Sequence, residues 1–333
     1  MTAGGDASMP LPPLDAELVE PLAQIMSGRR PSLLAEGIAD DRRKGETSVL
    51  DDDAISLSGT FEVEVAWAQS ADGALVELAV LTPRGAAAPI PVVLSIHGGG
   101  MVAGQHRSPE LLPELHRAAE LGMAVVSVSY RLAPEHPHPT PVEDCYAALR
   151  WIHDHASDRG FDPSAVLVSG VSAGGGLAAG VSILARDRGG PAVCGQVLLC
   201  PMLDDRVDTP SARQMTGIGL WDSISNRTGW TALLGSARGG PDVPPSAAPA
   251  RADDVTGLAP AYLDVGVYES LRDDSITYAA RLAQAGVDVE LHVWAGAFHS
   301  FDEWVPAAAV SRAAQATRVS WVRRRLAQRR TTV

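Results

Sequence analysis

The sequence predicts an α/β fold in which a mainly parallel sheet is covered by helices on both faces. From about residue 90 onward, short apolar runs rich in β-branched residues alternate with longer stretches of helical periodicity. The chain has 333 residues, of which 46% are hydrophobic and 20% charged. That size and balance suit one large domain with a smaller cap, and are too small for two full domains.

The N-terminal residues are predicted to form a segment separate from the sheet. Leucine and isoleucine recur at helical spacing from Leu14 to Met26, which predicts an amphipathic helix. Residues 27–58 are charged and irregular, and we expect a solvated connection that folds over a site. The expected organisation is therefore an N-terminal cap segment over 1–58 and a main domain over 59–333.

The strands of the main domain are recognised by their apolar patterns. Phe61–Trp67 alternates apolar and acidic residues, and Ala74–Leu81 follows it across a short turn, so the two predict an antiparallel pair at a sheet edge. Short, mainly apolar runs rich in β-branched residues predict buried strands. These runs are Pro91–Ile96, Ala124–Ser129, Ala165–Ser169, Val197–Cys200, Ala261–Val265 and Val287–Val293, and helical patterns lie at 109–121, 141–155, 173–187, 272–285 and 304–328.

Residues 203–257 interrupt this alternation. They contain the Pro/Gly-rich run Gly239–Pro249 and two tryptophans, Trp221 and Trp230. We expect a cap insertion between two strands that holds a helix or two. Either tryptophan could line a pocket or pack in the core, and the sequence leaves both alternatives open.

Charge and composition exclude several classes of function. The net charge is -13, which disfavours binding to nucleic acid or to anionic membranes. No run of 18 apolar residues occurs, so no stable membrane insertion is expected. The N-terminus lacks a basic region followed by an apolar core, and a cytoplasmic location is the default expectation. The three cysteines lack CxxC spacing and predict buried, reduced thiols rather than disulfides or a zinc site.

A candidate nucleophile lies where an apolar run meets a helical pattern. Gly170, Ser172 and Gly174 form a G-x-S-x-G frame between the strand at 165–169 and the helix at 173–187. A sharp strand–turn–helix of this kind exposes a serine at the carboxyl end of a sheet, on a helix N-terminus. The alternative is a glycine-rich turn without chemistry.

A second glycine-rich turn predicts an oxyanion hole. His97, Gly98, Gly99 and Gly100 follow the apolar strand at 91–96. Glycines let backbone amides face a developing oxyanion without a Cβ in the way, and we expect the amides of Gly99, Gly100 and Ala173 to be the donors. His97 and Gly98 are expected to support the loop. A phosphate loop is disfavoured because the Walker lysine is absent, and the spacing does not fit a dinucleotide fingerprint.

Candidates for the base and the acid of a nucleophilic triad lie further along the chain. His299 follows the last predicted strand, which places it at the same sheet edge as Ser172. A carboxylate must orient the imidazole, and Glu269, after the strand at 261–265, is the first candidate. Asp273 is the second, although it could instead cap the helix that begins there, and Asp264 is the third.

Five segments together resemble the hormone-sensitive lipase family of α/β-hydrolases, in its bacterial carboxylesterase branch. The resemblance runs from about residue 90 to the C-terminus. The segments are His97–Gly100, Tyr130–His136, Gly170–Gly174, Pro201–Arg206 and Phe298–Phe301.

The resemblance implies an α/β-hydrolase fold with a mostly parallel eight-stranded sheet, one antiparallel strand and a helical cap. It implies hydrolysis of short- to medium-chain carboxylic esters without a metal or cofactor, and a structural role for Tyr130–Glu135. Two departures stand out, namely Val171 where the family usually has Asp or Thr, and Glu269 where Asp is commoner. Hydrolysis of lactones, amides or a specialised natural-product ester, acyl transfer, a non-catalytic receptor and a homodimer remain alternatives that the sequence leaves open.

Overall fold

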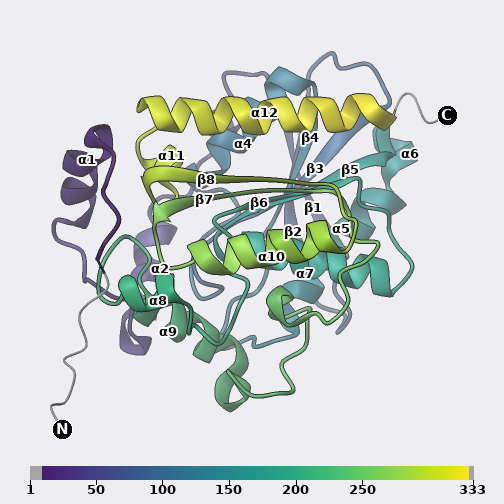
Figure 1. Ribbon diagram of the computed structural model, residues 1–333. Helices are drawn as coiled ribbons and strands as arrows, with labels where there is room; N and C mark the ends of the chain where they lie inside the picture. Colours follow the sequence, from purple (N-terminus) through teal and green to yellow (C-terminus); the bar gives the residue numbers. More distant parts are fainter. Residues whose placement is uncertain (1–9, 330–333) are drawn as a thin grey trace, which may run out of the picture.

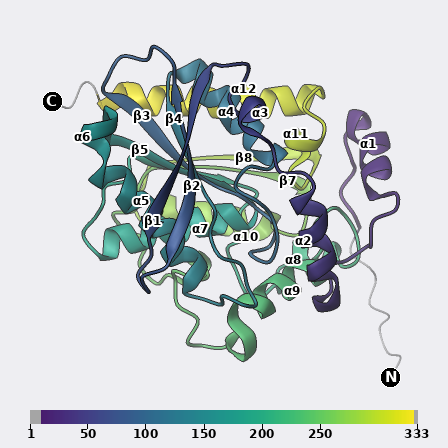
Figure 2. The same cartoon turned by 180° about the vertical axis from the view of Figure 1, so that it is seen from behind.

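The computed structural model describes residues 10–329, and within them a single sheet has eight strands. Their spatial order is β1-β2-β4-β3-β5-β6-β7-β8, and β2 is the strand that runs antiparallel to its neighbours. The strands are β1 (Phe61–Gln69), β2 (Leu75–Pro83), β3 (Ile90–Ile96), β4 (Ala124–Val128), β5 (Phe161–Val171), β6 (Gly195–Leu199), β7 (Ala261–Tyr268) and β8 (Val289–Phe298). The predicted mostly parallel eight-stranded sheet is confirmed, with the β1–β2 pair at one edge (Figure 2).

Helices cover both faces of the sheet, as predicted. The helices α4 (Leu112–Leu121) and α12 (Ala309–Arg329) lie on one face, and α5 (Thr140–Asp154), α7 (Ala173–Asp187) and α10 (Arg272–Gln284) lie on the other (Figure 1). Because successive side chains of a strand point to opposite faces, strands between two helical layers are apolar throughout. In β3, Val92 and Leu94 pack in the larger core cluster, whereas Val93 packs in the cluster beneath α4 and α12.

The carboxyl ends of the parallel strands share one edge of the sheet, and the candidate site lies there. The glycine loop follows β3, the nucleophile turn follows β5, and Glu269 and His299 follow β7 and β8. Figure 1 places α1 (Ala16–Met26), α2 (Ile38–Glu46), α8 (Pro210–Gln214) and α9 (Ser223–Leu234) together beyond this edge.

The expectation of an irregular segment at 27–58 is wrong, because this stretch contains α2 and α3 (Asp52–Ile55). Each of these short helices buries an isoleucine, Ile38 at 7% exposure and Ile55 at 0%. Arg42 of α2 also donates to the Val102 carbonyl at 2.6 Å and pairs with Glu135 at 2.8 Å. Helices this short depend on tertiary contacts, which charge-rich sequence patterns do not reveal.

The expected insertion between β6 and β7 holds α8 and α9, and it is joined to the N-terminal segment. Ser32 Oγ donates to Asp222 at 2.9 Å, and the Leu33 amide donates to Ser225 Oγ at 2.8 Å. Asp222 also caps α9 by accepting from the Ser225 amide. The two segments therefore form one layer beside the sheet.

None of the helices between residues 10 and 329 is long and apolar enough to cross a bilayer. The side chains of Cys145, Cys194 and Cys200 are all buried, which agrees with the expectation from their apolar surroundings.

Candidate active site

Ser172 lies at the turn between β5 and α7 in a strained backbone conformation. Its φ is 56° and its ψ is -118°, values that an L-residue adopts only when the surroundings enforce them. The chain passes so close to itself that a Cβ at Gly170 would collide with the backbone of Gly174, and a Cβ at Gly174 with the backbone of Ile96. The two glycines of the G-x-S-x-G frame are thus required by packing, and they leave the hydroxyl projecting from the turn.

His299 bridges Ser172 and Glu269. Its Nε2 lies 3.0 Å from Ser172 Oγ, and its Nδ1 lies 3.3 Å from Glu269 Oε1. The second carboxylate oxygen of Glu269 accepts from the Gly266 amide at 3.2 Å, which fixes the carboxylate. All three side chains are buried, so a protonated imidazole here would be stabilised mainly by the adjacent carboxylate.

The other two candidate acids have different partners. The carboxylate of Asp273 accepts from the Ser211 amide at 2.7 Å and from Arg272 at 2.7 Å. Asp264 accepts from Arg318 at 2.8 Å and from the Tyr262 hydroxyl at 3.2 Å. Neither carboxylate bonds to His299, so the geometry favours Glu269 for the orienting role.

Tyr130 holds the glycine loop from one side. Its hydroxyl donates to the carbonyls of His97 and Gly98 at 3.0 and 3.2 Å, and Nδ1 of His97 lies 2.9 Å from the Gly98 carbonyl. A trans peptide directs its N–H opposite to its carbonyl, so the Gly99 amide points away from Tyr130. The expected structural role of the Tyr130 segment thus has a specific form, which is the orientation of this loop.

The three expected donors, which are the amides of Gly99, Gly100 and Ala173, have no acceptor among the residues that the structure describes. Gly99 and Gly100 have φ values of +96° and +64°, and across residues 10–329 their amides bond to no protein oxygen. Ala173 is the first residue of α7, where a helix leaves its N–H groups unpaired. Gly98 differs, since its amide is already used by Glu110.

His97 has the character of a support rather than of a base. It stacks on Tyr130 with ring centroids 4.2 Å apart, and burial lowers the pKa of His97 to about 3. The ring is therefore neutral at neutral pH, and its Nδ1–H donates to the Gly98 carbonyl.

Glu110 is a site residue that sequence reasoning missed. Its Oε1 accepts from the Gly98 amide at 2.6 Å. Burial raises the pKa of Glu110 to about 7, while the Gly98 hydrogen bond and the nearby His299 oppose this shift. Glu303 shares the same small cavity behind the nucleophile turn, and burial, Glu110 and Asp302 raise its pKa. Glu110 belongs to no motif, so only the tertiary structure reveals it.

Trp221 is a site residue for which the sequence left two alternatives open. Its ring lies 6.5 Å from that of His299, and a Cβ at Gly100 would collide with it. Its backbone carbonyl accepts from Ser270 Oγ at 2.8 Å, which ties it to the residue after Glu269. Of the two tryptophans left open by the sequence, Trp221 faces the site, whereas Trp230 is fully buried in the core.

Cys200, Glu269 and His299 offer ligand atoms within 4.8 Å of one another, which is compatible with a metal ion. Both imidazole nitrogens of His299 already bond to side chains, and burial together with Glu269 raises the pKa of the Cys200 thiol. A thiol must lose its proton to bind a metal. These donors therefore fit a hydrogen-bonded relay better than a metal centre.

The sheet order and the Ser–His–Glu arrangement at its carboxyl edge define the class of α/β-hydrolase folds. A family model described as the alpha/beta hydrolase fold matches residues 93–303, and the chain belongs to this family.

Named relatives support this assignment. The esterase LipI of Mycobacterium tuberculosis is 41% identical over 207 residues, which cover 61% of this chain and 62% of LipI. The carboxylesterase NlhH of the same species is 38% identical over 229 residues, covering 66% of this chain and 70% of NlhH. The match thus spans slightly less than two thirds of LipI.

Solved structures are similar over nearly the whole chain. A bacterial heroin esterase is 40% identical with a TM-score of 0.85, over 94% of this chain and 98% of the other. The esterase LipW of Mycobacterium marinum is 30% identical with a TM-score of 0.82, over 95% and 98% of the two chains.

Proposed function

We propose that this protein is a serine carboxylesterase that hydrolyses short- to medium-chain carboxylic esters of small molecules. The observation that carries the proposal is the hydrogen-bonded series Ser172–His299–Glu269 beside three amides for which residues 10–329 provide no other acceptor. The esterase names of its relatives, LipI and NlhH, favour the same activity. The motif set further supports the hormone-sensitive lipase family as the specific group.

In the first half of the proposed reaction, Ser172 Oγ attacks the ester carbonyl carbon while His299 Nε2 takes the hydroxyl proton. The carbonyl oxygen becomes an oxyanion, to which the amides of Gly99, Gly100 and Ala173 donate. Glu269 stabilises the imidazolium. His299 then gives its proton to the leaving alkoxide oxygen, the C–O bond breaks, and an acyl-Ser172 ester remains.

In the second half, a water molecule replaces the alcohol. His299 Nε2 takes a proton from the water, whose oxygen attacks the acyl carbon, and the same amides bind the second oxyanion. The proton returns through His299 to Ser172 Oγ, which leaves the acid product and the free serine. The strained turn at Ser172 and the fixed loop supply this geometry before substrate binds, so little reorganisation is needed.

The cap assignment is part of the proposal. We assign residues 1–58 as a cap segment and 203–257 as a cap insertion on the catalytic domain 59–333, of which residues 1–9 and 330–333 lie outside the described part of the chain. The Ser32–Asp222 bond joins these two segments, and Trp221 brings the insertion to the site. Acyl-chain length is then limited by the space between this layer and the loop.

A panel of nitrophenyl esters from acetate to palmitate tests the activity and the chain length together. The unaltered protein is expected to turn over the shorter esters fastest, and Ser172→Ala should lower kcat by at least about 10⁴-fold. Turnover that survives Ser172→Ala at an unchanged rate would overturn the assignment of the nucleophile.

A further inference from the structure

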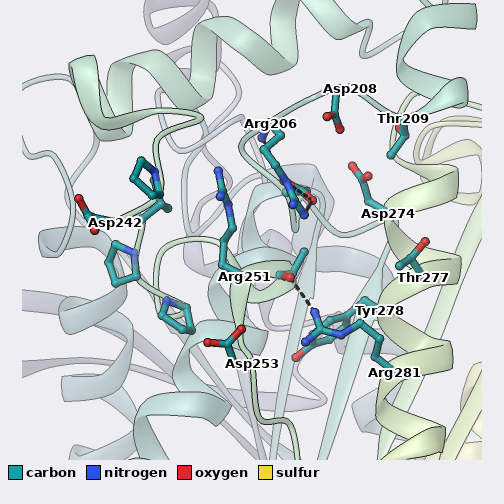
Figure 3. Close-up of a pocket in the computed structure, with 16 residues that line it drawn as sticks. Arg206, Asp208, Thr209, Asp242, Arg251, Asp253, Asp274, Thr277, Tyr278 and Arg281 are labelled. Atoms are coloured by element: carbon teal, nitrogen blue, oxygen red, sulfur yellow. Dashed lines mark hydrogen bonds and ion pairs between the residues drawn. The ribbon is translucent and has the colours of Figure 1, made fainter.

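A cleft of about 810 Å³ lies between the insertion and α10, and no member of the triad lines it. Figure 3 shows that several segments contribute charged residues around this cleft. Its volume falls in the range of small-molecule sites. Its polar lining comprises Asp204, Arg206, Asp208, Thr209, Asp242, Arg251, Asp253, Asp274, Thr277, Tyr278 and Arg281.

The positive charges of the cleft are directed at protein acceptors. Arg206 Nε donates to Asp204 at 2.8 Å, and Arg251 Nε donates to Asp205 at 2.7 Å. Arg281 donates to the carbonyls of Ala250 and Ala252, the first of these bonds at 2.7 Å (Figure 3). An anionic ligand would have to compete with these bonds, so the arginines do not form a ready anion site.

The floor of the cleft holds two polar groups that lack partners. Asp274 and Tyr278 are 3% and 0% exposed, and they lie four residues apart on α10, hence on one face of the helix. For Asp274 Oδ2 and the Tyr278 hydroxyl, no hydrogen-bond partner occurs in the part of the chain that the structure describes. Buried polar groups are rarely left unpaired. Other unpaired buried atoms occur in the described chain, such as Trp230 Nε1, but these two line the cleft, where a ligand has room to supply the partner.

The rim adds uncompensated negative charge. Asp208, Asp242 and Asp253 are exposed at the cleft, and between residues 10 and 329 no side chain pairs with their carboxylates. The unsatisfied groups of the cleft are therefore carboxyl groups and one phenol. A complementary ligand has to bring positive charge and several hydrogen-bond donors.

The spacing of these acids favours an extended cation over a bare metal ion. A directly bound metal needs several ligand atoms converging on one point. The one group of residues in the described chain whose ligand atoms converge in this way is Cys200, Glu269 and His299, outside the cleft. Carboxylates that are spread over a floor and a rim suit a molecule with separated ammonium groups.

We propose that this cleft binds an organic polyamine-type cation, with one ammonium donating to Asp274 and Tyr278 and the others facing the rim carboxylates. The site is separate from ester hydrolysis and does not depend on it.

The protonation of Asp274 gives the proposal a distinctive signature. Burial raises the pKa of Asp274 to about 8, and the neighbouring Asp204, Asp273 and Asp208 add to this rise while Arg206 opposes it. The empty cleft thus holds a protonated Asp274 near neutral pH. Because an ammonium favours the ionised carboxylate, its binding displaces a proton into the buffer.

Calorimetric titration of the full-length protein with spermidine tests the proposal. At neutral pH and physiological salt we expect saturable one-to-one binding, with proton release measured from two buffers of different ionisation enthalpy. Asp274→Asn should weaken binding at least about tenfold and abolish the proton release. Tyr278→Phe removes one oxygen from the floor and should weaken binding several-fold. Thermal melts of each variant establish that it is folded.

Asp158→Asn is the matched control, because it makes the same carboxyl-to-amide change at an exposed position on α6 (Ala156–Arg159), outside the cleft. It should bind like the unaltered protein, as should Ser172→Ala. The proposal is overturned if spermidine gives no saturable binding, or if Asp274→Asn and Tyr278→Phe both bind like Asp158→Asn. Binding of Mg²⁺ that depends on Asp274 while spermidine fails to bind would overturn the organic-cation assignment.

Discussion

The carboxyl group of Glu110 accepts a hydrogen bond from the amide of Gly98 at 2.6 Å, one residue before the expected oxyanion donors. On the other side of the loop, Tyr130 binds the carbonyls of His97 and Gly98. The peptide between His97 and Gly98 is therefore held at both its carbonyl and its amide, and the next peptide is held at its carbonyl. The orientation of the Gly99 amide follows from these bonds and not from glycine flexibility alone.

Loss of the Glu110 acceptor should impair turnover more than substrate binding. Glu110→Ala leaves the Gly98 amide unpaired, so the loop relaxes and kcat for a nitrophenyl butyrate should fall about 100-fold with a much smaller change in KM. Glu110→Gln keeps an acceptor oxygen and should retain most of kcat. Equal damage by both substitutions would contradict a positioning role based on this bond.

The acid of the triad is tested by a pair of substitutions. Glu269→Gln removes the charge beside His299 Nδ1 and should lower kcat by about 10³- to 10⁴-fold. Asp273→Asn alters a carboxylate that bonds to Ser211 and Arg272, and should change kcat less than about tenfold. Steady-state rates on the same ester decide between them. If Asp273→Asn loses most of its kcat while Glu269→Gln keeps it, the triad acid is Asp273 and not Glu269.

Trp221 and Gly100 are expected to be coupled by packing. Gly100→Ala places a Cβ against the indole at a φ of +64°, so it should lower both kcat and the free energy of unfolding. Gly122→Ala is the matched control, because Gly122 has a φ of +65° with no atom within 4 Å of its added Cβ. The control should lower the free energy of unfolding by only about 1 kcal/mol, which is the cost of a left-handed backbone conformation in an L-residue.

Urea unfolding and ester turnover measure this coupling. The double variant Gly100→Ala/Trp221→Ala removes the collision. Its loss in free energy of unfolding should therefore be smaller than the sum of the losses of the two single variants. A Gly100→Ala protein no less stable than Gly122→Ala would show that the indole is free to move away.

Asp274 makes stability depend on pH with a defined sign. The folded protein holds this proton up to about pH 8, whereas the unfolded chain releases it near its ordinary pKa of about 4. Between these values the folded state binds more protons, so its stability falls as pH rises. Asp274→Asn lacks this proton exchange and should gain about 4 kcal/mol over the unaltered protein between about pH 5 and 8, at about 1.4 kcal/mol per pH unit. Parallel pH profiles of urea unfolding check this, and identical slopes would contradict it.

The sequence predicted the elements that carry strong local signals. The strand before Ser172 and the helix after it predict the sharp turn at this serine. Small residues are needed there because the backbone packs closely against itself. His299 and Glu269 were selected because each follows a predicted strand, and parallel strands bring their carboxyl ends to one edge. The prediction that the strand at 287–293 is buried is wrong, because β8 is the edge strand and is largely half-exposed.

What the sequence did not predict depends on contacts between distant segments. Glu110 acts through a backbone amide twelve residues earlier, and Trp221 through a ring contact with His299. The helix α2 was missed because its charged residues mask its apolar side, and the partners of Arg42, which are Glu135 and the carbonyls of Val102 and Ala133, lie far away in the sequence. Such partners become visible only after the chain has folded.

Covalent labelling with a fluorophosphonate tests the central claim most directly, because this reagent reacts with a serine hydroxyl only when a base and oxyanion donors activate it. The account predicts one label per chain, located on Ser172 by peptide mapping and lost in both Ser172→Ala and His299→Ala. An unlabelled protein, or a label on another serine that persists in Ser172→Ala, would contradict it.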